Sequence, residues 1–153
     1  MTLTTQEKVW QTIAQRLRKA GSLIYIKKVI EGDRQVNIDA EIPCVVLEPK
    51  PSGESWVELP MRRQITMKID IRGVIDIRSR LDKQIIGDDS QVGIFRLEND
   101  IKKAFEGSDI RLSNNIDNYE LETLEYRNVN NEVREVVIRL SLELKYFDAE
   151  SRI

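Results

Sequence analysis

The stretch that decides the fold is residues 64–77, QITMKIDIRGVIDI. Apolar and polar side chains alternate along it, which is the period of a β-strand with one buried face and one solvated face. Parallel strands covered on both faces would instead be apolar throughout. This stretch therefore predicts a long strand in a largely antiparallel sheet.

The length of this strand predicts a bend or a projection. A strand over residues 63–78 would be about 50 Å long at about 3.3 Å per residue, whereas a domain of this size is about 40 Å across. Gly73, which supplies no side chain to the apolar positions, is the expected bend. A projecting strand suits pairing between subunits, because its edge groups lack partners in an isolated monomer.

Four further segments have strand character. Residues 136–146 repeat the alternation of apolar and polar side chains, and residues 119–126 show it with a one-residue slip, which predicts a bulge. The asparagines of residues 128–131 predict a hairpin turn between these two strands. Two shorter strands are expected at residues 23–30 and 44–47, which are rich in β-branched side chains.

Two amphipathic helices complete the pattern. Thr4 and Glu7 have the spacing of a capping box at the start of a helix over residues 5–20. Residues 94–105 carry an apolar stripe at helical period, and Asp88 is the expected cap of that helix. The predicted fold is α+β: a largely antiparallel or mixed sheet of four to five strands with two helices packed on one face. We expect residues 1–153 to form one domain.

Composition excludes several classes of chemistry. The 153 residues include 24 Lys and Arg, 26 Asp and Glu, no His and one Cys, with a formal net charge of -2. Without histidine there is no Ser-His-Asp or Cys-His triad and no His-ligated metal. The near-neutral charge gives no reason to expect free nucleic acid or an anionic membrane as the main ligand. Residues 1–7 lack the character of a signal peptide, and no run of 18 apolar residues occurs. We therefore expect a soluble protein made in a reducing compartment.

One segment has the residue types of a metal-dependent nuclease. Glu48 and Lys50 on a strand, with Asp39 as a second acid, would hold Mg²⁺ and position water. Pro49 is expected to break that strand, which argues against the site.

Two other features have simpler structural explanations. Asp88 and Asp89 form a possible cation site, although acids at the start of a helix are usually caps. Cys44 lies in an apolar strand, so a buried and inert thiol is expected rather than a nucleophile. No glycine-rich phosphate motif is present. We therefore expect no enzymatic activity and no cofactor.

A binding surface is the remaining possibility. Three prolines and a glycine in residues 49–61 predict a loop rather than a strand. Trp56 in this loop either contributes to an interface, as tryptophans often do, or folds back over its own core. The candidate interface residues are Trp56, Val57, Leu59, Arg62 and Arg63.

The order of these elements resembles a known family of phage proteins. The carriers are the N-terminal amphipathic helix, Glu41 to Pro49 (EIPCVVLEP), the long alternating strand, the segment Ile86 to Asp89 before the second helix, and the closing strand 136–146. Together they resemble tail terminator (tail completion) proteins of long-tailed bacteriophages, over about residues 5–147. The shared features are spacing patterns and not catalytic signatures.

The resemblance implies a structural virion protein. Members of this family form hexameric rings that cap the tail tube, end its polymerisation and join it to the head-side neck. The implied partners are further copies of the chain, the tail tube protein and a neck or connector protein, with DNA only passing through the lumen and no membrane involved. The implied location is the head-proximal end of the tail, after assembly in the host cytoplasm. A neck or head-tail connector protein is the alternative from the same particle, and a Mg²⁺-dependent nuclease is the alternative from another class.

Overall fold

A computed structural model describes residues 2–32, 36–56, 63–78, 84–88, 91–106 and 116–144. The helices, in chain order, are α1 (Thr5–Lys19), the 3-10 turn η1 (Gly21–Leu23), α2 (Ile38–Glu41) and α3 (Ile94–Lys103). The strands are β1 (Lys28–Glu31), β2 (Cys44–Trp56), β3 (Arg63–Asp76), β4 (Ile116–Val129) and β5 (Val133–Leu144). All the strands belong to one five-stranded sheet with the order β1-β2-β3-β5-β4.

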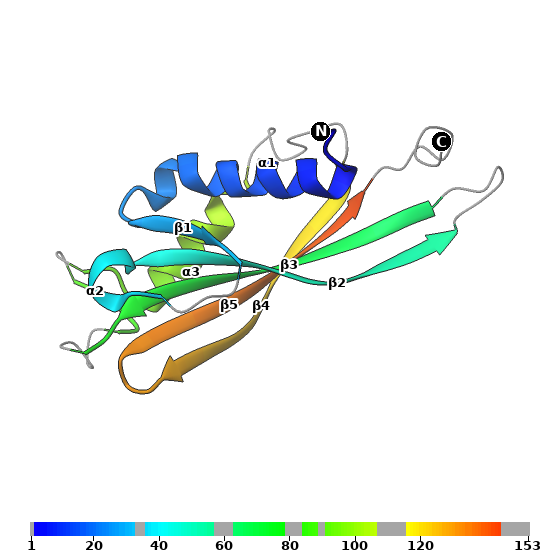
Figure 1. Ribbon diagram of the computed structural model, residues 1–153. Coiled ribbons are helices and arrows are strands. Elements are labelled where there is room, and N and C mark those ends of the chain that lie inside the picture. The colour runs from blue at the N-terminus through cyan, green and yellow to red at the C-terminus, as the bar shows by residue number, and fades with distance from the viewer. Residues whose placement is uncertain are drawn as a thin grey trace.

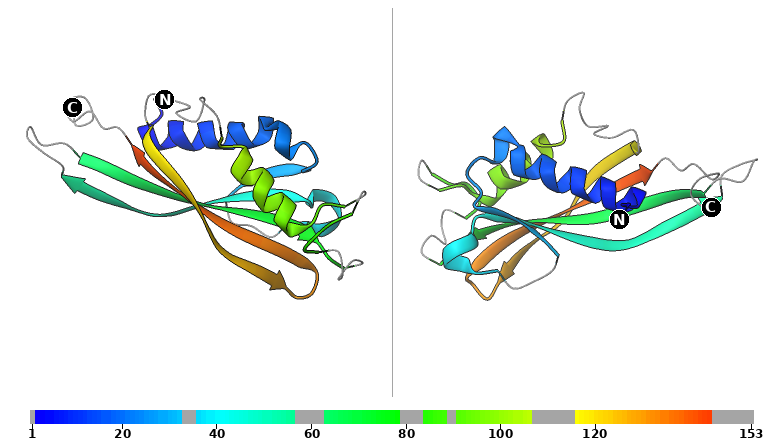
Figure 2. Two further views of the ribbon diagram at one scale, coloured as in Figure 1. Left: turned by 180° about the vertical axis from the view of Figure 1, so that it is seen from behind. Right: turned by 45° about the horizontal axis from the view of Figure 1, so that its top comes forward.

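The predicted α+β class is confirmed. β1 pairs with β2 in parallel, and every other strand pair is antiparallel, so the sheet is mixed. The two long helices, α1 and α3, lie on the same face of the twisted sheet (Figures 1 and 2). The short helix α2, which sequence analysis did not predict, begins at Asn37, whose side chain accepts from the backbone N–H of Asp39 and Ala40.

The main core lies between the sheet and the two long helices. The apolar positions of β3 that point to this face, such as Met67, Ile69 and Ile71, are buried there, as are Leu17 of α1 and Leu97 of α3. Burying a large apolar side chain contributes about 1.5–3 kcal/mol, so this face supplies most of the stability. The apolar positions of the alternating stretch 64–77 thus correctly predict the face of β3 that the helices cover.

Gly73 allows α3 to approach the sheet closely. A Cβ atom at this position would lie 2.8 Å from Cδ2 of Leu97 and 2.9 Å from Cδ1 of Ile101. The glycine expected as a bend in the long strand is therefore the place where the helix sits against the strand backbone.

The β4–β5 hairpin agrees with the sequence in both of its irregular features. Asn130 and Asn131 have φ values of 55° and 56°, which asparagine tolerates better than most residues and which a tight hairpin turn requires. The register of β4 against β5 shifts between Thr123 and Glu125, at the predicted bulge.

The prediction of a loop over residues 49–61 is wrong for its first part. β2 continues through Pro49 and Pro51 to Trp56 and pairs with β3 along its length, with a bulge between Lys50 and Gly53. The carbonyl of Leu47 accepts from the N–H of Gly32, so the backbone polar groups of Leu47, and by alternation those of Pro49, point away from β3. β1 ends at Glu31, so the donor that Pro49 lacks would lie on an open edge.

The first strand is shorter than residues 23–30. Residues 21–23 form the turn η1, and β1 begins only at Lys28. The hydroxyl of Ser22 donates to the carbonyl of Asp100, and that of Tyr25 to its carboxylate at 2.8 Å, so this segment is held against α3 in a turn.

The ends of the helices agree with the sequence only in part. At α1 the capping box is formed, with Thr4 and Glu7 bonded to each other's backbone N–H. Asp88 does not cap α3: its carboxylate accepts from the N–H of Gln91, and the helix begins after Gly93. Asp88 therefore closes a separate turn before the helix.

The expected projection is present. β2 and β3 run past the end of α1 as a projecting arm, which we define as residues 50–56 and 63–68 (Figure 1). At its base, residues 65–68 also pair with β5, and Met67 belongs to the core. In the residues described, no helix combines the length and apolar character that crossing a membrane requires.

Candidate functional site

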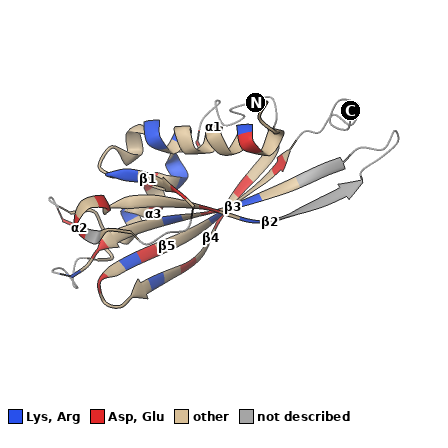
Figure 3. Cartoon of the chain, in the orientation of Figure 1, with Lys and Arg blue, Asp and Glu red and all other residues tan. Residues whose placement is uncertain are grey.

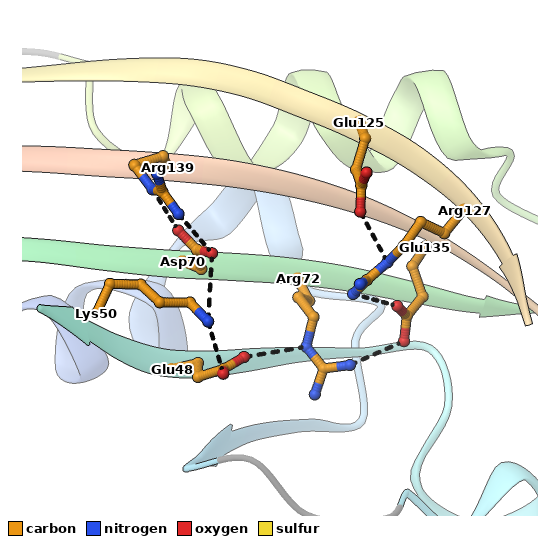
Figure 4. Close-up of polar contacts among 8 residues, drawn as sticks. All are labelled: Glu48, Lys50, Asp70, Arg72, Glu125, Arg127, Glu135 and Arg139. Carbon is orange, nitrogen blue, oxygen red and sulfur yellow. Dashed lines mark hydrogen bonds and ion pairs between the residues drawn. The ribbon is translucent and has the colours of Figure 1, made fainter.

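The sheet face opposite the helices carries a continuous series of ion pairs. Its eight members come from the polar positions of β2, β3, β4 and β5 (Figure 4). They are Glu48, Lys50, Asp70, Arg72, Glu125, Arg127, Glu135 and Arg139. We call this set the charge ladder.

One end of the ladder is the pair of Arg139 and Asp70. The guanidinium donates through Nε to Oδ1 at 2.8 Å and through Nη2 to Oδ2 at 3.2 Å, a two-point contact. This hydrogen bonding raises the pKa of Arg139 above its usual value. Asp70 is only 5% exposed, and Lys50 lies 3.9 Å from it and 2.8 Å from Glu48. Asp70 and its cationic neighbours therefore hold three strands in register.

The other end passes through Arg72 to β4. Arg72 lies 3.9 Å from Glu48 and 3.0 Å from Glu135, which is 6% exposed. Glu135 also accepts from Arg127 at 2.8 Å, and Arg127 lies 3.3 Å from Glu125. Each carboxylate in this part of the ladder thus faces at least one cation.

The ladder is electrically balanced, with four carboxylates and four cations. Figure 3 shows the same mixing on a larger scale, since residues of both signs are interspersed along the strands. A balanced and internally paired face has little attraction for a charged ligand such as nucleic acid. It explains instead why charged residues are tolerated at nearly buried positions of β3 and β5.

The structure does not support the metal site that the nuclease hypothesis requires, although the reason differs from the one that the sequence suggested. Pro49 does not break β2, and Glu48 and Lys50 both belong to the charge ladder on one face. Lys50 bonds to Glu48 itself at 2.8 Å. Asp39, the proposed second acid, lies on α2 and pairs with Arg78 at 2.6 Å. The structure therefore does not bring Asp39 and Glu48 together as the ligands of one ion.

The structure gives no support to the other candidate sites for chemistry, at Asp88, Asp89 and Cys44, in the residues that it describes. The part of the chain that the structure describes contains no cluster of three or more side chains that could hold a metal ion. Asp88 accepts a backbone N–H, while Asp89 lies outside the described residues. Cys44 is fully buried beside Val46 and Val74 in a small apolar cluster, which agrees with a buried thiol.

The candidate interface residues belong to the arm and its connection. Trp56 and Arg63 are paired in register as the last and first residues of β2 and β3, and only their backbone is described. Val57, Leu59 and Arg62 lie outside the described residues. The structure thus places the two ends of the predicted interface segment on the projecting arm.

Sequence analysis missed an exposed apolar surface at the β4 side of the sheet. Four large side chains form it, and we call them the edge patch: Ile85, Ile86, Phe95 and Tyr126. The rings of Phe95 and Tyr126 meet edge to face with centroids 5.8 Å apart. Ile85, Ile86 and Phe95 line one hollow of about 300 Å³. The available signal was Phe95, an aromatic residue outside the apolar stripe of its helix.

The edge patch rests on a rigid base. Glu98 of α3 accepts from the hydroxyls of Thr123 and Tyr126 and pairs with Lys102 at 3.4 Å. Burial opposes the ionisation of Glu98, but these hydrogen bonds and the lysine charge outweigh it and lower the pKa of the carboxyl. The bond to Glu98 in turn raises the pKa of Tyr126 to about 12. These contacts fix Tyr126 against α3.

The turn that carries Ile85 and Ile86 is equally constrained. A Cβ atom on Gly87 would lie 2.0 Å from the carbonyl oxygen of Gln91 and 2.5 Å from the nitrogen of Gly93. Two backbone segments therefore pass each other at a distance that only glycine permits. The exposed Ile86 is presented by a tight turn at the start of α3.

A groove of about 490 Å³ lies on the other side of the molecule, between α1 and the base of the arm. Its walls include Leu3, Trp10, Pro49 and Met67. Trp10 donates to Glu31 at 2.6 Å, and hydrogen bonds from Arg18 and Trp10 lower the pKa of this glutamate. The lining also contains Glu7, Lys50 and Lys68, so the groove combines apolar walls with side chains of both charges.

Comparison with known proteins gives one kind of match. No protein-family model and no curated protein sequence matches the chain. Among solved structures, the fold is similar to a chain described as the virion of a native gene transfer agent particle, with a TM-score of 0.53 and 12% sequence identity. The match covers 86% of this chain and 90% of that chain, so the likeness in fold extends over most of both chains.

Proposed function

We propose that this chain is a structural virion protein of a phage-like particle, and specifically a tail terminator that forms a ring on the tail tube. The observation that carries the proposal is the fold shared with a chain of a gene transfer agent virion over 86% of this chain. The order of elements that resembles tail terminators, from the capped first helix to the closing strand, supports the finer role.

The architecture is suited to a ring. A cyclic assembly needs two different surfaces on each subunit, so that one subunit's first surface meets its neighbour's second. The arm projects from the body of the sheet and supplies one of these two surfaces. In this proposal Trp56, Val57, Leu59, Arg62 and Arg63 contact the neighbouring subunit or the tube.

The charge ladder fits a structural role. A protein that surrounds passing DNA gains nothing from strong phosphate binding, because tight contacts would slow the passage. The balanced ladder and the formal net charge of -2 both satisfy this condition. In the proposed ring, the subunits cap the tube, end its polymerisation and join it to a neck protein at the head-proximal end of the tail.

Electron microscopy of the purified protein and of the particles tests this proposal. The expected result is a sixfold ring, alone or at one end of isolated tail tubes, and tubes of uncontrolled length in particles that lack the protein. A protein that is found only as a free monomer and never joins the tubes would contradict it. Density on the portal side without contact to the tube would favour the neck or head-tail connector alternative.

A further inference from the structure

The edge patch is the feature that the proposed function leaves without an explanation. The described residues include seven exposed large apolar side chains, and four of them make up this patch, with Ile86 75% and Phe95 51% exposed. Two more, Leu124 and Val129, lie on the adjoining strand β4. Single exposed apolar residues are common on monomers, but a group held rigidly together is typical of an interface.

The edge of the sheet beside the patch is open, whereas the opposite edge is protected. At the β1 side, Arg18 donates to the carbonyl of Val29, and Pro49 removes a donor from the exposed part of β2. β4 is the last strand of the sheet and contains no proline, and none of the described residues pairs with its outer edge. The patch and this edge together form a surface that can accept another strand or arm.

Position and charge indicate the occupant. The arm and the turn at the start of α3 lie at opposite ends of the molecule, so the arm cannot reach the patch of its own chain (Figure 1). Apart from the members of the charge ladder, residues 50–68 contain three basic and two acidic side chains, whereas residues 116–129 contain three acidic and no basic ones. Opposite charges on two separate surfaces favour a contact between copies in which the two surfaces differ.

We infer that the edge patch and the outer edge of β4 receive the arm of a second copy of this chain. The inference rests on the proposed function, because the ring is the assembly in which the second copy is present. It adds the identity of the receiving surface: apolar contacts at Ile86, Phe95 and Tyr126 on the helix-covered face. The exposed acids Glu120 and Glu122 of β4 lie along the same edge on the opposite face of the sheet.

Two complementary variants test the inference. The patch variant is Ile86→Asp, with Phe95→Asp as its replacement if circular dichroism shows a loss of folding. The arm variant carries both Arg62→Glu and Arg63→Glu. Ile24→Asp is the matched control, because Ile24 is 86% exposed and none of the contacts within the patch involves it. Sedimentation velocity measures the association of each variant alone and of the two mixed in equal amounts.

The expected result is specific to a contact between unlike surfaces. Each variant alone should associate at least tenfold more weakly than the wild type, while Ile24→Asp assembles normally. The mixture should form a heterodimer and nothing larger, because the intact arm of the patch variant fits the intact patch of the arm variant. Normal rings from both variants, or a mixture that stays monomeric, would overturn the inference.

Other outcomes separate the inference from the proposed function. If the wild type and both variants form rings, the assignment of the receiving surface is contradicted and the tail terminator role is not. A heterodimer in the mixture, with a wild type that forms open chains and does not join tail tubes, would support the receiving surface and contradict the terminator role. A wild type that stays monomeric with and without tubes would contradict both.

Discussion

Tyr126 of β4 donates its hydroxyl to Oε1 of Glu98 on α3 at 2.6 Å, so the outer strand of the sheet is tied to the helix that covers it. Thr123 bonds to the same carboxylate, and Phe95 packs against the Tyr126 ring. Further along β4, the hydroxyl of Tyr119 donates to the carbonyl of Phe105 at 3.2 Å, so the strand contacts the helix side at two places besides its pairing with β5. The contact of Tyr126 with Glu98 therefore connects the stability of the sheet edge with the shape of the edge patch.

Removing the Tyr126 hydroxyl should weaken this connection. Tyr126→Phe keeps the ring and is expected to lower the free energy of unfolding by about 1 kcal/mol. Because the folded pKa of Tyr126 is about 12, above the ordinary value of 10.0, the bond stabilises the protein fully below pH 10 and is lost as the pH rises through 12. Urea unfolding at neutral and alkaline pH should show the difference between wild type and variant shrinking as the pH rises. A difference that does not change with pH would contradict this account.

The charge ladder gives a prediction about paired charges. Arg139→Met leaves the nearly buried Asp70 with Lys50, at 3.9 Å, as its remaining ion-pair partner among the described residues, and is expected to cost about 2 kcal/mol. Replacing both partners, as Asp70→Val with Arg139→Met, should cost less than the single change, because no buried charge is left without its partner. Denaturant unfolding of the two single variants and the double variant measures the coupling. Simple additivity would mean that the pair does not act as a unit.

The sequence predicted the parts of the fold that depend on local periodicity. The alternation over residues 64–77, the capping box at Thr4 and the bulge after Thr123 each follow from a few neighbouring residues, and each is confirmed. β2 was misjudged because the effect of a proline depends on which way its missing donor would point. That direction is set by the register of β2 between β1 and β3, and β1 ends before it reaches Pro49. A local pattern contains neither fact.

The candidate surfaces were predicted less well than the fold. The edge patch joins the turn at Ile86, the first turn of α3 and the C-terminal part of β4, and β4 is far from the other two in the chain. The charge ladder likewise depends on register, since Glu135 meets Arg72 and Arg127 only through the pairing of three strands. The alternation indicated which residues lie on the outer face, but not which partners they meet.

Gly73 offers a test of the close contact between α3 and the sheet. Gly73→Ala places a methyl group 2.8 Å from Leu97, in a core where that side chain is fully buried, so a loss of about 1–3 kcal/mol is expected. Gly21→Ala is the control, because nothing lies within 4 Å of the new methyl group. That change should cause no loss and a gain of up to about 1 kcal/mol. Thermal and urea unfolding compare them, and equal effects would mean that the helix tolerates the methyl group.

Trp56 distinguishes an interface role from a role inside the monomer. If it is an interface residue, Trp56→Ala should weaken assembly by about 2 kcal/mol or more. Sedimentation equilibrium then shows a weaker association, and urea unfolding shows a monomer of nearly unchanged stability. Unchanged assembly together with a marked loss of monomer stability would mean that Trp56 covers its own core.

Pro49 should protect the arm against unwanted pairing. Because the carbonyl of Leu47 is directed to β1, a donor restored by Pro49→Val would face the part of β2 that β1 leaves open. The backbone hydrogen bonds to β3 lie on the other side of β2, so the free energy of unfolding should change by less than about 0.5 kcal/mol. The variant is expected to form additional, concentration-dependent aggregates rich in β-structure, detectable by light scattering and thioflavin fluorescence.

The control is Lys68→Val on the neighbouring strand, since it also adds an apolar side chain to the arm but restores no donor. Aggregation of the Lys68 variant to the same extent would attribute the effect to apolar character, whereas aggregation of the Pro49 variant alone assigns it to the backbone donor.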